Sequence, residues 1–118
     1  MIAREKTQLP SDVSLVKIVV DIERKVASFG SELHTDCYEE LMKDGSSPKN
    51  LWGANILTKN KTIEFVSMIN IRPADGNRGM EIKNSEIRNA VEAVIKNLFS
   101  FAQNTSPLCG EDGWASEE

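Results

Sequence analysis

Three ionisable side chains alternate early in the chain, where Glu32, His34 and Asp36 are separated by single residues. In an extended strand, alternate side chains leave the same face, so this spacing would place the three groups together. Imidazole and carboxylate groups in that arrangement can bind a divalent cation or form an acid–base pair. The structural alternative is that Glu32 pairs with Lys17 on a neighbouring strand, that Asp36 caps a helix and that His34 ends a strand. The three residues are therefore candidates for catalysis, and a metal is left open.

A second polar cluster surrounds the loop 73–79, which contains two glycines. Its candidate anion-binding residues are Asn70, Arg72, Asn77 and Arg78. Glycines let backbone N–H groups turn inward, and guanidinium groups bind phosphate or carboxylate through paired hydrogen bonds. Alternatively, Pro73 and Gly76 form an ordinary turn and Asp75 pairs with Arg78. The loop matches neither a P-loop nor a dinucleotide-binding pattern, so no cofactor is predicted.

The two cysteines give little support to nucleophilic or zinc chemistry. Cys37 and Cys109 lack zinc-ligand spacing, and His34 is the only histidine. Cys37 with His34 is thus the only nucleophile–base pair that the sequence offers. Whether the protein is an enzyme is left open.

The net charge of −4 is concentrated at one end of the 118-residue sequence. Glu111, Asp112, Glu117 and Glu118 follow Gln103 with no base among them, so the preceding part is neutral. A neutral body argues against electrostatic binding of nucleic acid. No apolar run approaches the length of about 20 residues that a membrane span needs, and the first ten residues carry no apolar leader. We therefore expect a cytoplasmic protein that does not enter a membrane.

The elements that would position both clusters begin with a long amphipathic helix near the end of the chain. Its apolar residues recur at helical spacing, at Ile87, Val91, Val94, Ile95, Leu98, Phe101 and Ala102. Asn84 or Ser85 can cap its first turn, and Glu92 and Lys96 are spaced to form an ion pair.

A first β-hairpin is predicted from residues 16–22 and 26–33. A turn at residues 24–25 sets Val20 opposite Phe29 and places the larger apolar side chains on one face.

A second hairpin is predicted from residues 51–58 and 61–72 around a turn at residues 59–60. Its register sets Ile56 opposite Ile63. The apolar face continues through Trp52, Ile69 and Ile71.

Between the hairpins, Thr35 or Asp36 with Glu39 resembles a capping box and starts a short helix that ends near Gly45. The order ββαββα predicts an α+β fold, in which a four-stranded, mainly antiparallel sheet is covered on one face by the long C-terminal helix. We expect a single domain over residues 1–102 and a flexible acidic tail over 103–118.

Six short motifs in this order resemble one small family. They are GSELHTD (30–36), DGS (44–46), LWGAN (51–55), SMINIRP (67–73), GNR (76–78) and EIR (86–88). The family comprises uncharacterised bacterial and archaeal proteins and is known as a domain of unknown function. The resemblance covers roughly residues 16–99 and implies an intact domain, but no activity.

Two functions remain open after these observations. The first is a binding or assembly module, expected to be a homodimer. Its mixed sheet face would be covered by a partner subunit or by the short helix, and consists of Val19, Val26, Leu51, Val66 and Met68. The alternative is a small enzyme or a metal- or anion-binding protein that uses Glu32 with His34 and Arg72 with Arg78.

Overall fold

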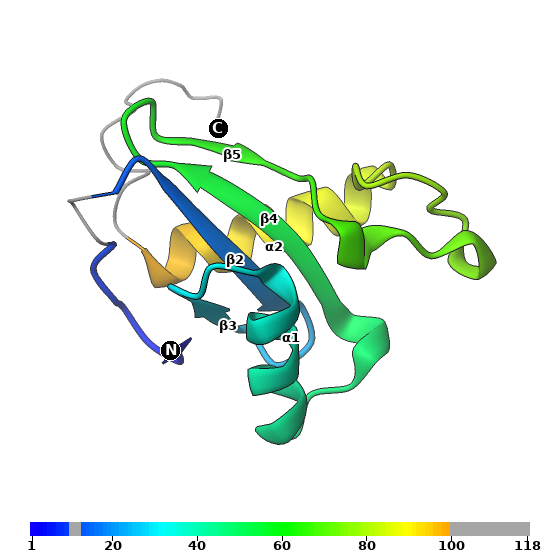
Figure 1. The fold of residues 1–118 in the computed structure, drawn as a ribbon, viewed down its shortest axis with the longest axis horizontal. Helices are drawn as coiled ribbons and strands as arrows, with labels where there is room; N and C mark the ends of the chain where they lie inside the picture. The colour runs from blue at the N-terminus through cyan, green and yellow to red at the C-terminus, as the bar shows by residue number, and fades with distance from the viewer. Residues whose placement is uncertain (10–12, 100–118) are drawn as a thin grey trace.

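The computed structural model describes residues 1–9 and 13–99, and its centre is a five-stranded antiparallel sheet (Figure 1). The strand order is β1-β3-β2-β4-β5. The strands are β1 (Ile2–Ala3), β2 (Leu15–Asp21), β3 (Val26–Phe29), β4 (Leu51–Leu57) and β5 (Thr62–Glu64). The α+β class is confirmed. The prediction of four strands was one short, because Ile2 and Ala3 pair with Ser28 and Ala27 at the edge of the sheet.

The first hairpin forms with a register that differs by two residues from the predicted one. Val20 pairs with Ala27, and Asp21 pairs with Val26. The Asp21 carboxylate accepts hydrogen bonds from the N–H groups of Glu23 and Arg24, both at 2.9 Å. This side-chain cap stabilises a longer turn than the predicted one. Because the difference is an even number, the predicted side chains still share a face.

The second hairpin keeps the predicted register, with Ile56 opposite Ile63. Its second strand is much shorter than predicted, because β5 ends at Glu64. The chain then forms two single turns of 3-10 helix, η2 (Met68–Asn70) and η3 (Pro73–Asp75). Residues 65–84 therefore make a long connection that extends from one end of the sheet (Figure 1).

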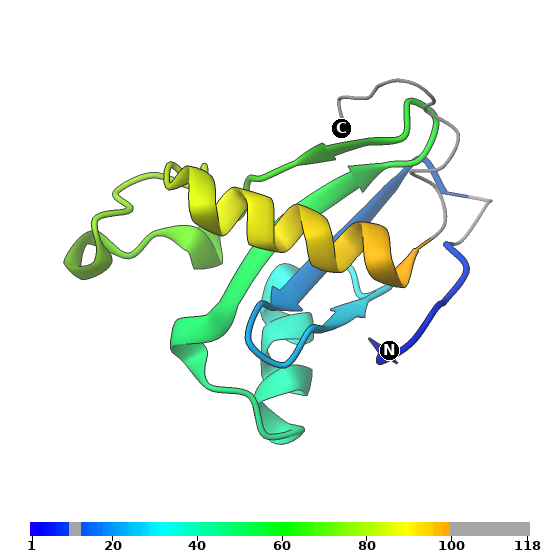
Figure 2. The same cartoon turned by 180° about the vertical axis from the view of Figure 1, so that it is seen from behind.

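The long helix α2 (Ser85–Leu98) covers one face of the sheet (Figure 2). Its Asn84 cap is confirmed, since the side-chain oxygen accepts from the N–H groups of Glu86 and Ile87. The Glu92–Lys96 ion pair is also present, at 2.7 Å. The core on this side includes Ile18, Val20, Ala27, Trp52, Ile56, Val91 and Ile95. The predicted contribution of Phe101 and Ala102, and the tail at 103–118, lie outside the described residues.

The opposite face of the sheet is covered by the short helix α1 (His34–Lys43) (Figure 1). Val19, Val26 and Leu51 are buried there against Cys37 and Leu41. We expected either a partner subunit or the short helix to cover this face. Over these three residues, the structure has the short helix.

The predicted capping box at the start of α1 was wrong. The helix begins at His34, one residue before Thr35, and Leu33 precedes it in an extended conformation with no side-chain cap. Asp36 is therefore an acidic residue of the first turn, where a carboxylate interacts favourably with the helix dipole. A 3-10 turn, η1 (Pro48–Asn50), then leads from α1 into β4.

Candidate functional site

The alternating residues Glu32, His34 and Asp36 do not lie on a strand, because β3 already ends at Phe29. Glu32 lies exposed in the bend before α1, and Asp36 lies exposed in the first helical turn. His34 is half-buried, and its ring Nε2 lies 2.8 Å from the main-chain oxygen of Ala54 in β4. Within residues 1–9 and 13–99, no group of three His, Cys, Asp or Glu side chains is placed to hold a metal ion.

The environment of His34 disfavours its charged form. Burial lowers the pKa of the imidazole, and the nearby Lys17 acts in the same direction. The bond to Ala54 opposes this effect without cancelling it. The contact with Ala54 anchors the start of α1 to the central sheet. The other half of the predicted nucleophile–base pair, Cys37, is fully buried.

Lys17 contacts the backbone near Glu32 and not its carboxylate. Its Nζ donates to the main-chain oxygen of Glu32 at 2.8 Å. The cross-strand ion pair expected from the sequence is therefore replaced by a bond that holds the bend between β3 and α1.

Asn70 is fully buried and ties the long connection 65–84 to β4. Its side-chain oxygen accepts from the N–H of Gly53 at 2.8 Å, and its amide nitrogen donates to the oxygen of Gly53 at 3.0 Å. The same nitrogen donates to the oxygen of Met80 at 3.0 Å. One side-chain amide thus takes the place of a neighbouring strand.

The close approach at this point depends on a glycine. A Cβ on Gly53 would lie 2.5 Å from the Cβ of Ser67. Two carbon atoms that are not bonded to each other do not approach so closely, so a larger residue would push the connection away from β4.

Asn77 holds the second half of the connection in the same manner. Its amide nitrogen donates to the oxygens of Asn70, Gly79 and Glu81, and its side-chain oxygen accepts from the N–H of Lys83. All four bonds go to the main chain. The amides of Asn70 and Asn77 are thus occupied in shaping the loop that we considered an anion site.

Arg72 also faces inward. Its guanidinium lies 4.1 Å from the centre of the Trp52 ring. It donates to the main-chain oxygens of Ile69, Lys49 and Leu51. Burial lowers its pKa, while Tyr38 and Asp75 act in the opposite direction. No carboxylate of the described residues lies within ion-pair distance of this guanidinium.

In contrast to Asn70, Arg72 and Asn77, Arg78 is exposed to solvent. It follows Asn77, whose backbone pairs with that of Arg72 through N–H···O bonds of 2.6 and 3.0 Å. The predicted four-residue cluster therefore consists of three side chains that hold the main chain and one that extends outward.

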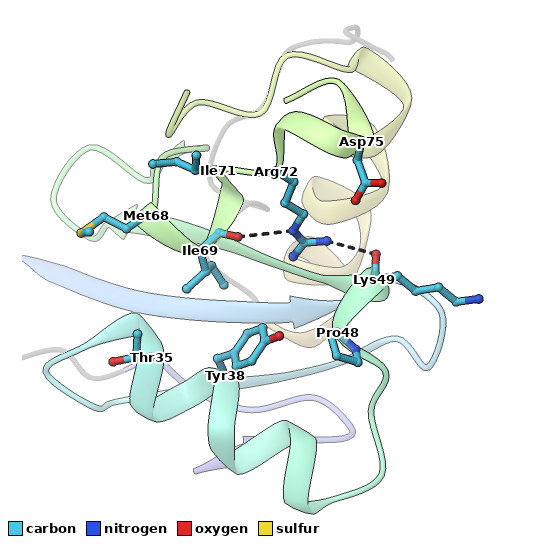
Figure 3. A pocket seen from close by; sticks show the side chains of 9 residues that line it. All are labelled: Thr35, Tyr38, Pro48, Lys49, Met68, Ile69, Ile71, Arg72 and Asp75. Atoms are coloured by element: carbon cyan, nitrogen blue, oxygen red, sulfur yellow. Dashed lines mark hydrogen bonds between the residues drawn. The ribbon is translucent and has the colours of Figure 1, made fainter. Parts of the chain in front are cut away.

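A cleft of about 530 Å³ opens beside Arg72, between α1 and the η2–η3 segment (Figure 3). It is lined by Thr35, Tyr38, Pro48, Lys49, Met68, Ile69, Ile71, Arg72 and Asp75. In Figure 3, Tyr38 rises from α1 on one side of the cleft, and Arg72 reaches across from the other toward Lys49. We call this the Arg72 cleft.

A second cleft, of about 380 Å³, adjoins the first and shares Thr35, Met68 and Ile69 with it. Its other lining residues are Lys17, Leu33, His34, Asn55, Val66, Ser67 and Met80. We call it the His34 cleft, and the two together the α1–η2 groove. Imidazole and guanidinium, nominated by separate sequence clusters, thus line adjoining parts of one surface.

Exposed apolar side chains gather along this groove. The exposed fractions are 74% for Met68, 55% for Leu33, 46% for Met80 and 43% for Ile71. These are half of the large apolar residues that are exposed in the described part of the chain. The sequence did not single out Leu33, Met80, Tyr38 or Lys49. Of these, only Met80 lies in the connection 65–84, and a long connection rich in Met and Ile is a signal that could have found it, since such connections are often functional.

Two further findings bear on the class of the protein. Within the described ranges, no helix has the length and apolar character needed to cross a membrane. Comparisons with curated proteins and with solved structures found no match. A family model matches residues 5–98, which is most of the chain. The chain therefore belongs to a family described as protein of unknown function (DUF5674).

Proposed function

We propose that this protein is a small binding module that holds a segment of a protein partner in the α1–η2 groove. The observation that carries the proposal is the gathering of four exposed apolar side chains around two adjoining clefts. Exposed apolar surface is costly in water, and its concentration at one place is typical of binding surfaces.

The charges along the groove indicate the chemistry of the segment. Lys17 lines the His34 cleft, while Lys49 and Arg72 line the other. Asp75 is the one acidic residue among the lining side chains. An apolar segment flanked by carboxylates would therefore fit both the apolar middle and the cationic ends.

The alternative of an enzyme or of a metal- or anion-binding protein has weaker support. His34 is bonded to the main chain, and its pKa is lowered by burial. Asn70 and Asn77 use their side-chain polar atoms to hold the connection 65–84. These contacts explain the residues without a reaction.

The proposal is tested with a short synthetic peptide in which leucine and tryptophan are flanked by aspartates. Calorimetry on the full chain should show saturable binding that weakens at higher salt concentration. Met68→Ser should weaken binding several-fold, because it removes the most exposed apolar side chain of the groove. Met42→Ser, a methionine of α1 that does not line the groove, is the matched control.

A peptide that carries lysines in place of the aspartates is the control with reversed charge. The proposal fails if both peptides bind equally, or if the two methionine variants behave alike. In either case the apolar side chains or the cations would not be recognising the segment.

We also propose that the protein forms a homodimer and that it is located in the cytoplasm. The exposed apolar surface supports association. A solution mass measured at high protein concentration tests the first point, and a monomer contradicts it.

A further inference from the structure

The sequence outside the described residues holds a segment with the chemistry that the groove would bind. Trp114 lies between the acidic pairs Glu111–Asp112 and Glu117–Glu118. The two clefts of the groove share Met68 and Ile69. Lys17 lines one cleft, and Lys49 and Arg72 line the other beside the single acid Asp75. The order acidic, aromatic, acidic thus complements the order cationic, apolar, cationic.

We propose that residues 111–118 bind in the α1–η2 groove of their own chain, so that an external partner must displace them. This inference rests on the proposed function, because it names an occupant for the same groove.

The length of the connecting chain permits the contact. The last described residue is Phe99, at the end of α2. From there to Asp112 the chain can extend over about 40 Å, since each extended residue spans about 3.3 Å. The longest dimension of the molecule is 36 Å. A tether of this kind also raises the local concentration of the segment to about the millimolar range, so weak contacts suffice.

Arg72 strengthens the argument for an acidic occupant. Its guanidinium has five N–H groups, and the structure records bonds from three of its nitrogen atoms to main-chain oxygens. Burial lowers its pKa, and the described residues provide no carboxylate within ion-pair distance. A carboxylate from residues 111–118 would offset the cost of burying this charge.

The test uses Cys109, which lies in the same part of the sequence, as the attachment point for a nitroxide spin label. Cys37 is fully buried, so the label should react at Cys109, and mass spectrometry checks that each chain carries one label. The isotope-labelled full chain should show amide signals broadened at Leu33, Thr35, Met68 and Ile69. Signals on the outer face of α2, such as those of Ala93 and Asn97, should stay sharp.

Trp114→Ser in the spin-labelled chain should remove that selective broadening. Thr105→Ala, which changes neither an acid nor an aromatic residue of the segment, is the matched control and should retain it. Even broadening over all faces of the domain would overturn the inference. So would broadening that appears only when a spin-labelled chain is mixed with an isotope-labelled chain that lacks the label, because the contact would then join two copies.

The aspartate-flanked peptide separates this inference from the proposed function. If the peptide binds Trp114→Ser several-fold more tightly than the unaltered chain, both are supported. Equal binding to the two proteins supports the binding function and overturns the internal occupant. Selective broadening in the unaltered chain, without peptide binding to either protein, supports the internal occupant and overturns the binding of a partner in this groove.

Discussion

At the scale of single residues, side chains in this protein complete main-chain hydrogen bonding where regular structure ends. Asn70 bonds to both polar groups of Gly53, and Asn77 bonds to main-chain groups of four residues. Arg72 stacks on Trp52 while bonding to three carbonyl groups. Because buried polar groups must be paired, removing any of these side chains leaves main-chain atoms unsatisfied.

Gly53→Ala is expected to destabilise the protein by about 1–3 kcal/mol, because the added methyl group would collide with Ser67. Urea unfolding measures the loss. The matched control is Gly79→Ala, since a Cβ there meets nothing within 4 Å. Equal stability of the two variants would contradict the close packing of Ser67 on β4.

His34 predicts a pH dependence of stability. Its folded pKa lies below the ordinary value of 6.5, so the unfolded chain takes up the proton first as the pH falls. The free energy of unfolding should therefore decrease from about pH 6.5 downward until the folded pKa is passed. In His34→Gln this part of the decrease should vanish, as unfolding at about pH 7.5 and about pH 5 can measure. An NMR titration that places the folded pKa above 6.5 would contradict the burial of the ring.

At the scale of elements, an ion-pair cluster joins the β2–β3 turn to the end of α1. Asp44 accepts from Arg4 at 2.5 Å and from Arg24 at 2.7 Å. Arg24 also donates to Ser46 at 2.7 Å. The cluster therefore anchors the end of α1, while His34 anchors its start, and the position of one wall of the groove depends on both.

Asp44→Asn tests this anchor. Hydrogen bonds from Arg4 and then Arg24 lower the pKa of Asp44 to about 2. A depressed pKa contributes stability above the unfolded value of 3.8, and this contribution is lost as the pH falls toward about 2. The variant should thus be less stable than the unaltered protein at neutral pH, and the difference should shrink toward zero as the pH falls to about 2. A difference that persists at the acidic end would show that the effect is not ionic.

Most regular elements could be predicted from the sequence, but the edge strand β1 and the connection 65–84 could not. The period of the apolar residues and the cap at Asn84 predicted α2, and β-branched residues predicted β2. Alternation and the turn at residues 59–60 predicted β4 and the Ile56–Ile63 register. Alternation also continued past Glu64, which led to a false strand over 65–72. There, the contacts of Asn70 with Gly53 override the local preference, and such contacts between distant residues leave no periodic signal.

The candidate site was predicted only in part, for the same reason. His34 and Arg72 do lie beside the groove, although neither has the surroundings that the sequence suggested. Their shared position depends on the packing of α1 and η2 against β4, which spacing along the chain does not reveal. Met80 was missed because an isolated apolar residue in a loop carries no pattern. Leu33 was wrongly assigned to the predicted strand 26–33, whereas β3 ends at Phe29 and Leu33 is exposed.

At the scale of the whole molecule, the two helices leave unequal surfaces. Helix α2 covers one face of the sheet, while the shorter α1 covers part of the other (Figures 1 and 2). The groove lies between α1 and η2. The exposed apolar side chains Leu33, Met68, Ile71 and Met80 line this groove. The proposed binding surface is thus already formed in this fold.

The most direct test of the α1–η2 groove as a binding surface is a two-dimensional amide NMR titration of the full chain with the aspartate-flanked peptide. We expect saturable shifts at Thr35, Met68, Ile69 and Arg72, and unchanged signals on the outer face of α2, at Ala93 and Asn97. Shifts that occur on α2 and spare the groove, or a spectrum that stays unchanged at saturating peptide, would contradict the assignment of the α1–η2 groove as the binding surface.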